Sequence, residues 1–307
     1  MTSALPLALM LLFAVGCAQA HPGKALSVSS ASALPRSKSS HVLVIMMENE
    51  ENTSIVGNPA APYANALIRR YGLATQSYAI THPSLPNYLA LTSGSTQGVS
   101  SDCTECHTSS VNIVDQLEVA HISWKAYMED LPAPCFKGSE AGGYAKKHDP
   151  FIYYDDVASS ARRCDHIVGF GALSSDLRKG SLPTYAWISP NLCDDGHDCG
   201  VSGGDKFLAR AVPSLLRELG PQGFLVLTWD EGATNDGCCG GAAQGGHIAT
   251  IVAGPEVRRG ARDSEPIDHY GVLGTIEEAL GLATLGGAGE PNSGRLTGLF
   301  THPPHIT

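Results

Sequence analysis

Two apolar runs, residues 42–47 and 224–229, constrain the fold of this chain more than any other feature. Each run is six residues long and continuous, which is typical of a strand buried on both faces of a parallel sheet. Such strands need helices on both sides of the sheet. Helical patterns lie between the predicted strands, at 65–71, 111–120, 205–219 and 269–280. This alternation predicts an α/β fold with a mostly parallel central sheet and helices on both faces.

Acidic and amide side chains follow both runs, at the point where each strand should end. Glu48 and Asn49 follow the first run, and Asp230 and Glu231 follow the second. In open α/β sheets ligands bind at the carboxyl ends of the strands, so both pairs should face one crevice. Hard oxygen ligands of this kind suit a divalent cation. Solvated acids are also common at strand ends, and it is the coincidence of two pairs that favours a site.

Ser84 lies between two prolines in the segment 82–87, His-Pro-Ser-Leu-Pro-Asn. Each proline fixes its own φ and restricts the residue before it, so we expect Ser84 to be extended in a turn before a helix that starts near Asn87. A serine hydroxyl needs a neighbouring base or metal to become a nucleophile near neutral pH, and the acid pairs could supply that. The alternative is an ordinary proline turn that caps a helix. Ser202, in a G-x-S-x-G pattern, is rejected because no strand runs into it.

Two segments that contain histidine adjoin further predicted strands. Residues 190–199 follow the predicted strand 185–188 and are too rich in Asp, Gly and His to be a mere connector. His247 directly precedes the predicted strand 248–252. A single loop histidine is usually solvated, but these two flank strands of the sheet that carries the acids.

The ordered set of these segments resembles the bacterial and fungal phosphoesterase family, which contains acid phosphatases and phospholipase C enzymes. That family belongs to the alkaline-phosphatase-like superfamily, and the resemblance covers about residues 41–283. No single segment is specific, but their order is. The segments are Met46-Met47-Glu48-Asn49, His82-Pro83-Ser84-Leu85-Pro86-Asn87-Tyr88, Lys147-His148-Asp149-Pro150-Phe151, Pro190-Asn191-Leu192, Asp195-Gly196-His197-Asp198-Cys199, Trp229-Asp230-Glu231-Gly232, Gly246-His247-Ile248 and His269-Tyr270.

The resemblance implies an alkaline-phosphatase-like fold and a role for individual residues. Ser84 is implied as the nucleophile that attacks phosphorus, and His197 as the group that protonates the leaving alkoxide. The implied metal ligands are Glu48, Asn49, Ser84, Asp230 and Glu231. The implied substrate-binding residues are His82, Asn87, Asp195 and His247. Family members often carry two adjacent aspartates where this chain has Asp230 and Glu231, so Glu231 departs from the pattern.

The implied cofactor is a divalent metal cation. Oxygen-rich ligation favours calcium or magnesium, whereas direct histidine ligation would favour zinc. A second ion about 4 Å away would need Asp195, His197 or His247 as a ligand, and the sequence is compatible with one ion or two.

The first 20 residues have the features of a signal peptide. They contain no charged side chain, and an apolar core precedes the small-residue cleavage site Ala18-Gln19-Ala20. We therefore expect a secreted or periplasmic protein, with residues 21–40 as a disordered lead-in and 41–307 as one phosphoesterase domain. A lipoprotein anchor through Cys17 is the minor alternative. No later segment has the roughly 20 consecutive apolar residues that span a bilayer, so stable membrane insertion is not expected.

The chain has nine cysteines, and cleavage after Ala20 would leave eight. In an oxidising compartment, closely spaced cysteines favour local disulfides over a zinc site. Local bridges are expected at Cys103–Cys106 and Cys193–Cys199. The second would hold the loop around Asp195 and His197 rigid. The adjacent Cys238 and Cys239 are expected to pair with distant partners.

The net charge of −10 makes nucleic acid an unsuitable partner, and basic residues occur only as isolated pairs. A small phosphorylated substrate is the expected partner, and a bound cation would invert the local field for it. The oligomeric state has no sequence signal. We therefore expect a secreted, metal-dependent phosphoric ester hydrolase of acid-phosphatase type with a phosphoserine intermediate. The alternatives are a phosphodiesterase or phospholipase C acting on lipid head groups, and a non-catalytic metal- or phosphate-binding secreted protein.

Overall fold

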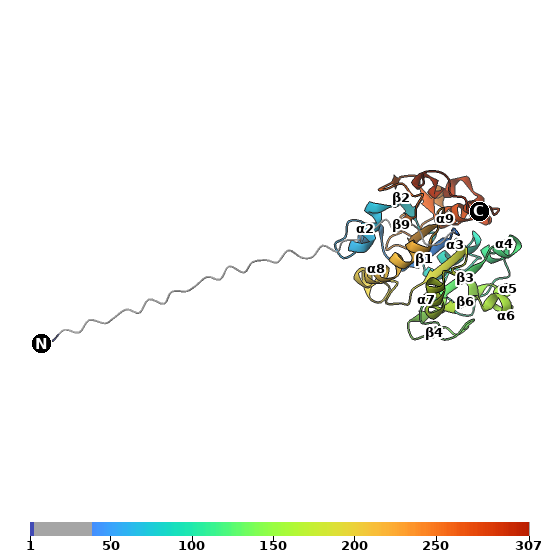
Figure 1. Ribbon diagram of the computed structural model, residues 1–307, viewed down its shortest axis with the longest axis horizontal. Coiled ribbons are helices and arrows are strands. Elements are labelled where there is room, and N and C mark those ends of the chain that lie inside the picture. The colour runs from blue at the N-terminus through green and yellow to red at the C-terminus, as the bar shows by residue number, and fades with distance from the viewer. Residues whose placement is uncertain (3–38, 307) are drawn as a thin grey trace. The chain divides into compact units, whose positions relative to one another are not determined.

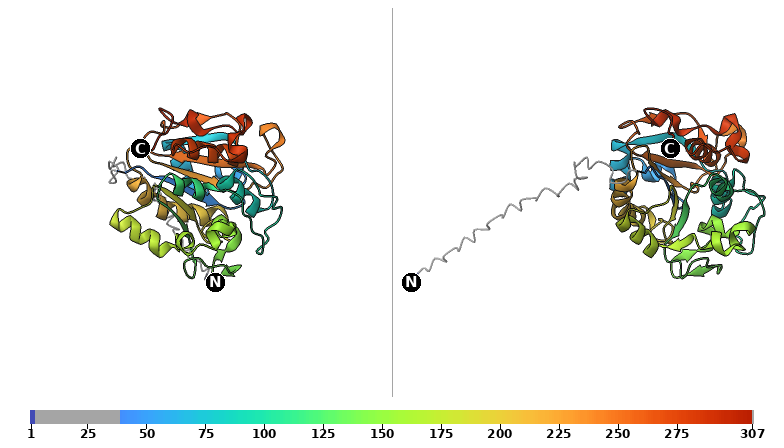
Figure 2. Two further views of the ribbon diagram at one scale, coloured as in Figure 1. Left: turned by 90° about the vertical axis from the view of Figure 1, so that its right-hand side faces the viewer. Right: turned by 45° about the vertical axis from the view of Figure 1, so that its right-hand side comes forward.

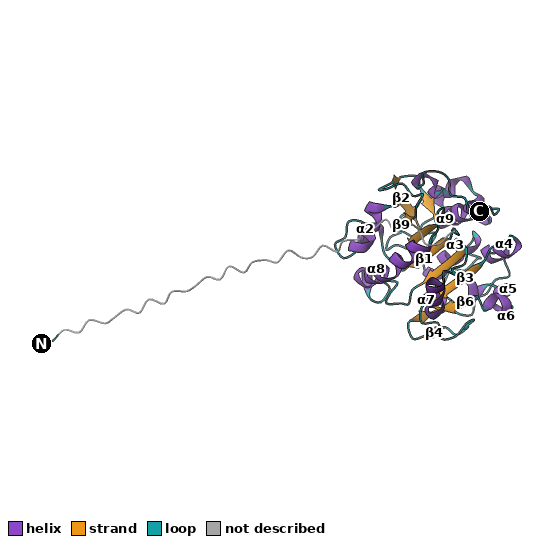
Figure 3. Ribbon diagram, viewed as in Figure 1, coloured by secondary structure: helices purple, strands orange, loops and turns teal. Residues whose placement is uncertain are grey.

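A computed structural model describes residues 1–2 and 39–306 of the chain, and a nine-stranded sheet forms its centre (Figures 1 and 3). The predicted signal peptide beyond residue 2 and the lead-in up to residue 38 lie outside the described residues. The sheet strands are β1 (Val42–Met47), β2 (Gly72–Tyr78), β3 (Trp124–Met128), β6 (Ile167–Gly169), β7 (Tyr185–Ser189), β8 (Phe224–Trp229), β9 (His247–Ala253), β10 (Arg262–Asp263) and β11 (Ile267–Asp268). A separate hairpin consists of β4 (Glu140–Ala141) and β5 (Tyr144–Ala145).

The strand order is β10-β2-β9-β8-β1-β7-β3-β6, with β11 also pairing with β2. Strand β9 is antiparallel to both of its neighbours, and the other pairs in this sheet are parallel. Both apolar runs form central, fully buried strands with the predicted bounds. The predicted mostly parallel α/β fold is confirmed.

Alternate residues of β1 belong to different hydrophobic cores. Val44 and Met46 pack with α3, α4 and α9, whereas Ile45 and Met47 pack with α2, α7 and α8. Figures 1 and 2 show helices on both sides of the sheet accordingly. The helices are α1 (Asn52–Ile55), α2 (Pro62–Arg70), α3 (Ser84–Ser93), α4 (Ile113–Val119), α5 (Asp155–Ala158), α6 (Ala161–Cys164), α7 (Phe170–Lys179), α8 (Gly200–Glu218) and α9 (His269–Ala279). Among the described residues, no helix has the length and apolarity to cross a membrane.

Helix α8 begins earlier than its sequence suggests. Asp205 is a good N-cap by residue type, yet the helix starts at Gly200 and Asp205 lies inside it. Its carboxylate instead accepts hydrogen bonds from the backbone N–H groups of Tyr63 (3.0 Å) and Ala64 (2.8 Å). The N-cap position of α2 is Ala61, which has no side-chain acceptor, so Asp205 caps α2 rather than the helix that contains it.

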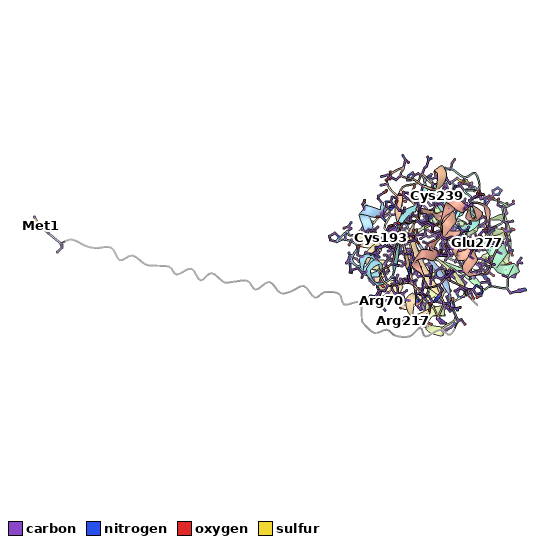
Figure 4. All side chains as sticks on the ribbon, turned by 90° about the horizontal axis from the view of Figure 1, so that it is seen from above. Met1, Arg70, Cys193, Arg217, Cys239 and Glu277 are labelled. Carbon is purple, nitrogen blue, oxygen red and sulfur yellow. A yellow bond between two sulfur atoms is a disulfide. The ribbon has the colours of Figure 1, made fainter. Side chains whose placement is uncertain are left out.

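Four disulfides join the eight cysteines between residues 103 and 239, and Figure 4 labels Cys193 and Cys239. The two predicted local bridges, Cys103–Cys106 and Cys193–Cys199, are present, and Cys135 pairs with Cys164. The expectation of distant partners for Cys238 and Cys239 is wrong, because these adjacent residues pair with each other. Their loop folds back on itself, with hydrogen bonds from Gly241 N to Cys238 O and from Cys238 N to Ala243 O.

The topology gathers one end of several strands at the same edge of the sheet. Strands β1, β2, β7 and β8 run in one direction, so their carboxyl ends lie together. Strand β9 runs the opposite way, and its first residue, His247, therefore lies at this edge too. The segment after β2 leads directly into α3 and Ser84. Every residue proposed for the site follows one of these strand ends or begins β9.

Candidate active site

Ser84 is the first residue of α3 and is only 1% exposed. Its Oγ donates to Glu48 Oε2 at 3.1 Å and lies 3.4 Å from Glu231 Oε1. The helix begins three residues before the predicted start, because Pro86 in the first helical turn has no N–H that needs a partner. The serine is therefore a helix-start residue rather than an extended turn residue, and its hydroxyl faces the acid pairs.

Asn87 fixes the backbone that leads into Ser84. Its Oδ1 accepts from the N–H groups of Ile80 and Thr81, and its Nδ2 donates to the carbonyls of Thr81 and Pro83. These four bonds occupy both ends of the amide, which is fully buried. The structure thus gives Asn87 a positioning role beside the substrate-binding role implied by its sequence.

The acid pairs meet because β1 and β8 are neighbours in register. Met47 is opposite Trp229, so Glu48 and Asp230 emerge side by side, and both are fully buried. Asn49 N–H donates to Asp230 Oδ1 at 2.9 Å. With Glu231, these residues bring three carboxylates into one small volume.

The Asn49 side chain closes this group of oxygens. With its NH₂ group turned toward them, the amide donates to Glu48 Oε2 at 3.1 Å, to Glu231 Oε1 at 3.1 Å and to Asp230 Oδ1 at 3.2 Å. Three buried carboxylates still bring together more negative charge than one amide offsets, and with Oδ1 turned inward the same amide would become an oxygen ligand for a cation. Burial and the charges of Glu48 and Glu231 also hold the pKa of Asp230 well above its usual range. Buried charges are paired or coordinate metals, and this donor set fits a hard divalent cation.

His148 is a site residue whose role the sequence did not predict, although it belongs to one of the matching segments. It ends a short 3₁₀ helix, Lys146–His148, and is buried. Its Nε2 lies 3.2 Å from Glu48 Oε2, and its Nδ1 lies 3.2 Å from Asp195 Oδ2. Although burial alone would lower it, the two carboxylates raise the pKa of His148 to about 9.

This second cluster, consisting of Glu48, His148 and Asp195, has ligand atoms close enough to share a metal ion. Within residues 39–306, His148 Nε2 and Asp195 Oδ2 are buried and have ion-pair contacts at 3.2 Å but no hydrogen bond, so both atoms could serve as metal ligands. Tyr88, one helical turn after Ser84, donates its hydroxyl to Glu48 Oε1. Burial acts to raise the pKa of Glu48, but His148 and the Tyr88 hydroxyl hold it below its ordinary value.

His82 lies behind Glu231. Its Nδ1 contacts Glu231 Oε2, and its Nε2 lies 2.9 Å from the carbonyl oxygen of Thr234. Both ring nitrogens therefore have protein partners. Glu51 supports the same loop, since its carboxylate accepts from the N–H groups of Ala233, Thr234 and His247.

The Cys193–Cys199 bridge encloses Asp195 and His197, as predicted. Asp195 Oδ1 accepts from the backbone N–H of His197 at 2.8 Å. The His197 ring lies 6.2 Å from the His148 ring, and its Nδ1 is 2.7 Å from Asp198 Oδ1. With a side chain 32% exposed, His197 is accessible from solvent beside the buried cluster.

The His247 ring takes a different direction from the rest of the predicted site. Its Nε2 lies 2.9 Å from the carbonyl oxygen of Thr75, and the ring stacks on Tyr78 with centroids 5.0 Å apart. These contacts hold the imidazole against the β2–β9 ladder. The structure brings Ser84 and the four predicted metal ligands together, and it places His247 apart from them.

Comparisons with known proteins agree with this geometry. The sequence model of the Phosphoesterase family matches residues 57–283, so Glu48 and Asn49 precede the matched part. A phosphatidylinositol-3-phosphatase from Mycobacterium tuberculosis (strain H37Rv) is 34% identical over 259 residues, which cover 84% of this chain and 81% of that protein. An acid phosphatase from Aspergillus fumigatus is 31% identical over 227 residues, covering 70% of this chain and 49% of that protein.

Solved structures share the fold at low sequence identity. A protein in the alkaline phosphatase superfamily from Vibrio parahaemolyticus has a TM-score of 0.56 and 15% identity, covering 85% of this chain and 70% of that chain. The phosphonate monoester hydrolase of Agrobacterium radiobacter has a TM-score of 0.55 and 12% identity, covering 83% and 79%. Both the match to most of the chain and the shared architecture lead to one conclusion: the chain belongs to the phosphoesterase family and has the alkaline-phosphatase-like fold.

Proposed function

We propose that this chain is an exported, metal-dependent phosphomonoesterase of acid-phosphatase type that works through a phosphoserine on Ser84. The family and the relatives indicate the general class of the enzyme, a phosphoric ester hydrolase. The observation that supports this mechanism is the Ser84 hydroxyl, which donates to buried Glu48 Oε2 and lies 3.4 Å from Glu231 Oε1, with the Asn49 amide next to the same carboxylates.

Five residues would hold the cation: Glu48, Asn49, Ser84, Asp230 and Glu231. When bound, a divalent cation lowers the pKa of the hydroxyl and stabilises charge on the phosphoryl oxygens. The mostly oxygen donor set favours calcium or magnesium, whereas use of the neighbouring His148 would favour zinc.

Ser84 Oγ forms a bond to phosphorus as the bond to the leaving alkoxide breaks. The hydroxyl proton leaves along the hydrogen bond that Ser84 already makes to Glu48 Oε2. His197, accessible and paired with Asp198, protonates the alkoxide, which departs as an alcohol. A water molecule then attacks the phosphorus and gives a proton to His197, while the Ser84 Oγ–phosphorus bond breaks and Oγ takes back the proton from Glu48. Inorganic phosphate leaves, and the Ser84 hydroxyl and both side chains are restored.

A phosphomonoester is the favoured substrate class over a diester. The similar proteins named phosphatidylinositol-3-phosphatase and acid phosphatase both carry names of monoester hydrolases. The phosphodiesterase alternative has no observation of its own in this structure.

The test combines kinetics with trapping of the intermediate. Wild-type protein, Ser84→Ala and the control Ser202→Ala, whose serine is exposed on α8, should be assayed with p-nitrophenyl phosphate before and after treatment with chelator. We expect wild type and Ser202→Ala to be active and chelator-sensitive, and Ser84→Ala to lose activity by about a thousandfold or more. Acid quenching followed by mass spectrometry should place a phosphate on Ser84. Full activity of Ser84→Ala, or of metal-free protein, would overturn the mechanism.

A further inference from the structure

Asp102 connects the start of α3 to a lysine that the proposed mechanism does not use. Its Oδ1 accepts from the backbone N–H of Leu85 at 3.0 Å, and its Oδ2 accepts from Lys147 Nζ at 3.1 Å. Leu85 directly follows Ser84. A single carboxylate therefore separates the Lys147 ammonium group from the first turn that carries the nucleophile.

Lys147 differs sharply from its neighbour Lys146. The Lys146 Nζ contacts the carbonyl oxygen of Thr104 and lies 4.9 Å from the Tyr153 ring centroid, in a buried setting. The Lys147 side chain is 23% exposed and therefore partly accessible to solvent. Although burial acts to lower it, Asp102 and, more weakly, Glu48 and Asp230 raise the pKa of Lys147.

Asp102 has a clear physical role in this arrangement. Glu48, Asp230 and Glu231 form a dense negative group that would attract a free ammonium. Because Asp102 is hydrogen-bonded to Leu85 as well as to Lys147, it holds the ammonium beside α3. The loop that carries Asp102 is closed immediately afterwards by the Cys103–Cys106 disulfide.

We propose that Lys147 is a substrate-binding residue that pairs with the second negative charge of a phosphomonoester and so sets a preference for monoesters over diesters. The inference rests on the proposed function, since it concerns the same site. A monoester is a dianion near neutral pH, whereas a diester has one charge and a second organic group. An ammonium group that Asp102 links to the residue after Ser84 would therefore stabilise the monoester more.

The experiment compares Lys147→Met, Lys147→Arg and a matched control. Lys125→Met is suitable as the control because Lys125 also forms a partly exposed ion pair, with Asp176 at 2.6 Å, but extends from β3 away from the candidate site. Each protein is assayed with p-nitrophenyl phosphate and with bis(p-nitrophenyl) phosphate. Metal content, melting temperature and the inhibition constant of inorganic phosphate are measured in parallel.

For Lys147→Met we expect kcat/KM for the monoester to fall about 10- to 100-fold, the range for losing a hydrogen bond to a charged group. The diester value should change by less than about threefold, and inhibition by inorganic phosphate should weaken in step with the monoester loss. Lys147→Arg should restore most of the preference, and Lys125→Met should leave it unchanged.

Three outcomes would overturn the proposal. An equal decrease of kcat/KM for both esters would show that Lys147 stabilises α3 and does not distinguish the charge of the substrate. Unchanged kcat/KM for both esters would show that Lys147 does not bind substrate. A preference that Lys147→Arg fails to restore would exclude charge as the cause. If wild-type protein hydrolyses neither ester, the proposed function itself is wrong. That result differs from an active enzyme whose preference for monoesters is the same in the Lys147 variants as in wild type.

Discussion

The rings of Tyr88 and His148 stack with centroids 5.3 Å apart and planes only 4° from parallel. Both side chains also contact Glu48, Tyr88 through its hydroxyl at Oε1 and His148 through Nε2 at Oε2. The carboxylate is thus held at both of its oxygens by a stacked pair from α3 and from the 3₁₀ helix Lys146–His148. Since Ser84 and Tyr88 lie one turn apart on α3, this contact also fixes Ser84 relative to Glu48.

Tyr88→Phe should keep the ring stacking and remove only the hydroxyl contact to Glu48. Loss of an outer-shell partner of a metal ligand costs about 10- to 100-fold in affinity or activity, so we expect a decrease of that size in kcat and in metal retention. Elemental analysis and a metal titration would measure the second effect. Wild-type metal affinity in this variant would show that the Tyr88 hydroxyl does not orient Glu48.

His82→Gln should weaken metal binding rather than substrate binding. His82 holds Glu231 Oε2 from behind and is itself held by the Thr234 carbonyl, so its loss frees Glu231 to rotate. We expect metal affinity to fall about tenfold, with KM unchanged once metal is saturating. A raised KM at full metal occupancy would instead support the substrate-binding role that the family resemblance implies for His82.

The disulfide Cys193–Cys199 should matter more for activity than for stability. In the chain-entropy model so short a loop contributes about 2 kcal/mol, whereas a shift of about 1 Å in a catalytic group can reduce the rate a hundredfold. The double variant Cys193→Ser, Cys199→Ser should therefore fold and lose most of its activity. The matched control is Cys238→Ser, Cys239→Ser, which opens another local bridge. Equal loss of activity in both variants would argue against a special role for the Asp195–His197 loop.

The parts of the fold and site that were predictable follow from continuous local patterns. Strands β1 and β8 match their apolar runs, and because both are parallel and central, their following acids had to meet at one edge. His148 was not assigned a role because it comes from an irregular segment without periodicity, and only the tertiary fold brings it between Glu48 and Asp195.

Other errors also arise where long-range contacts override local preference. Asp205 has the chemistry of an N-cap, but the helix that needs an acceptor is α2, which the sequence does not place beside it. The Cys238–Cys239 pairing depends on a loop that turns back through Gly240 and Gly241, both with positive φ. In both cases the residue type shows that a side chain can cap a helix or form a disulfide, but only the tertiary fold determines which helix or which cysteine it contacts.

Glu277 makes the stability of the folded chain depend on pH at a place away from the candidate site. It lies on α9 and is labelled in Figure 4. Its side chain is fully buried, Oε1 accepts from Leu285 N–H, and Oε2 lacks a hydrogen-bond partner among residues 39–306. Burial raises the pKa of Glu277 to about 8 from an ordinary value of 4.5, despite the opposing Leu285 hydrogen bond.

Because the folded state keeps this proton up to a pH of about 8 while the unfolded chain releases it above about 4.5, the stabilising contribution is complete below 4.5 and is lost as the pH rises to 8. Glu277→Gln stays neutral and retains the acceptor for Leu285, so its melting temperature should fall less than that of wild type between pH 5 and pH 8.5. Glu278→Gln is the matched control, since Glu278 is the next residue on α9 but its side chain is exposed and forms an ion pair with Arg295. Thermal melts of the three proteins across this range test the prediction, and parallel curves for wild type and Glu277→Gln would show that Glu277 is already ionised in the folded protein at pH 5.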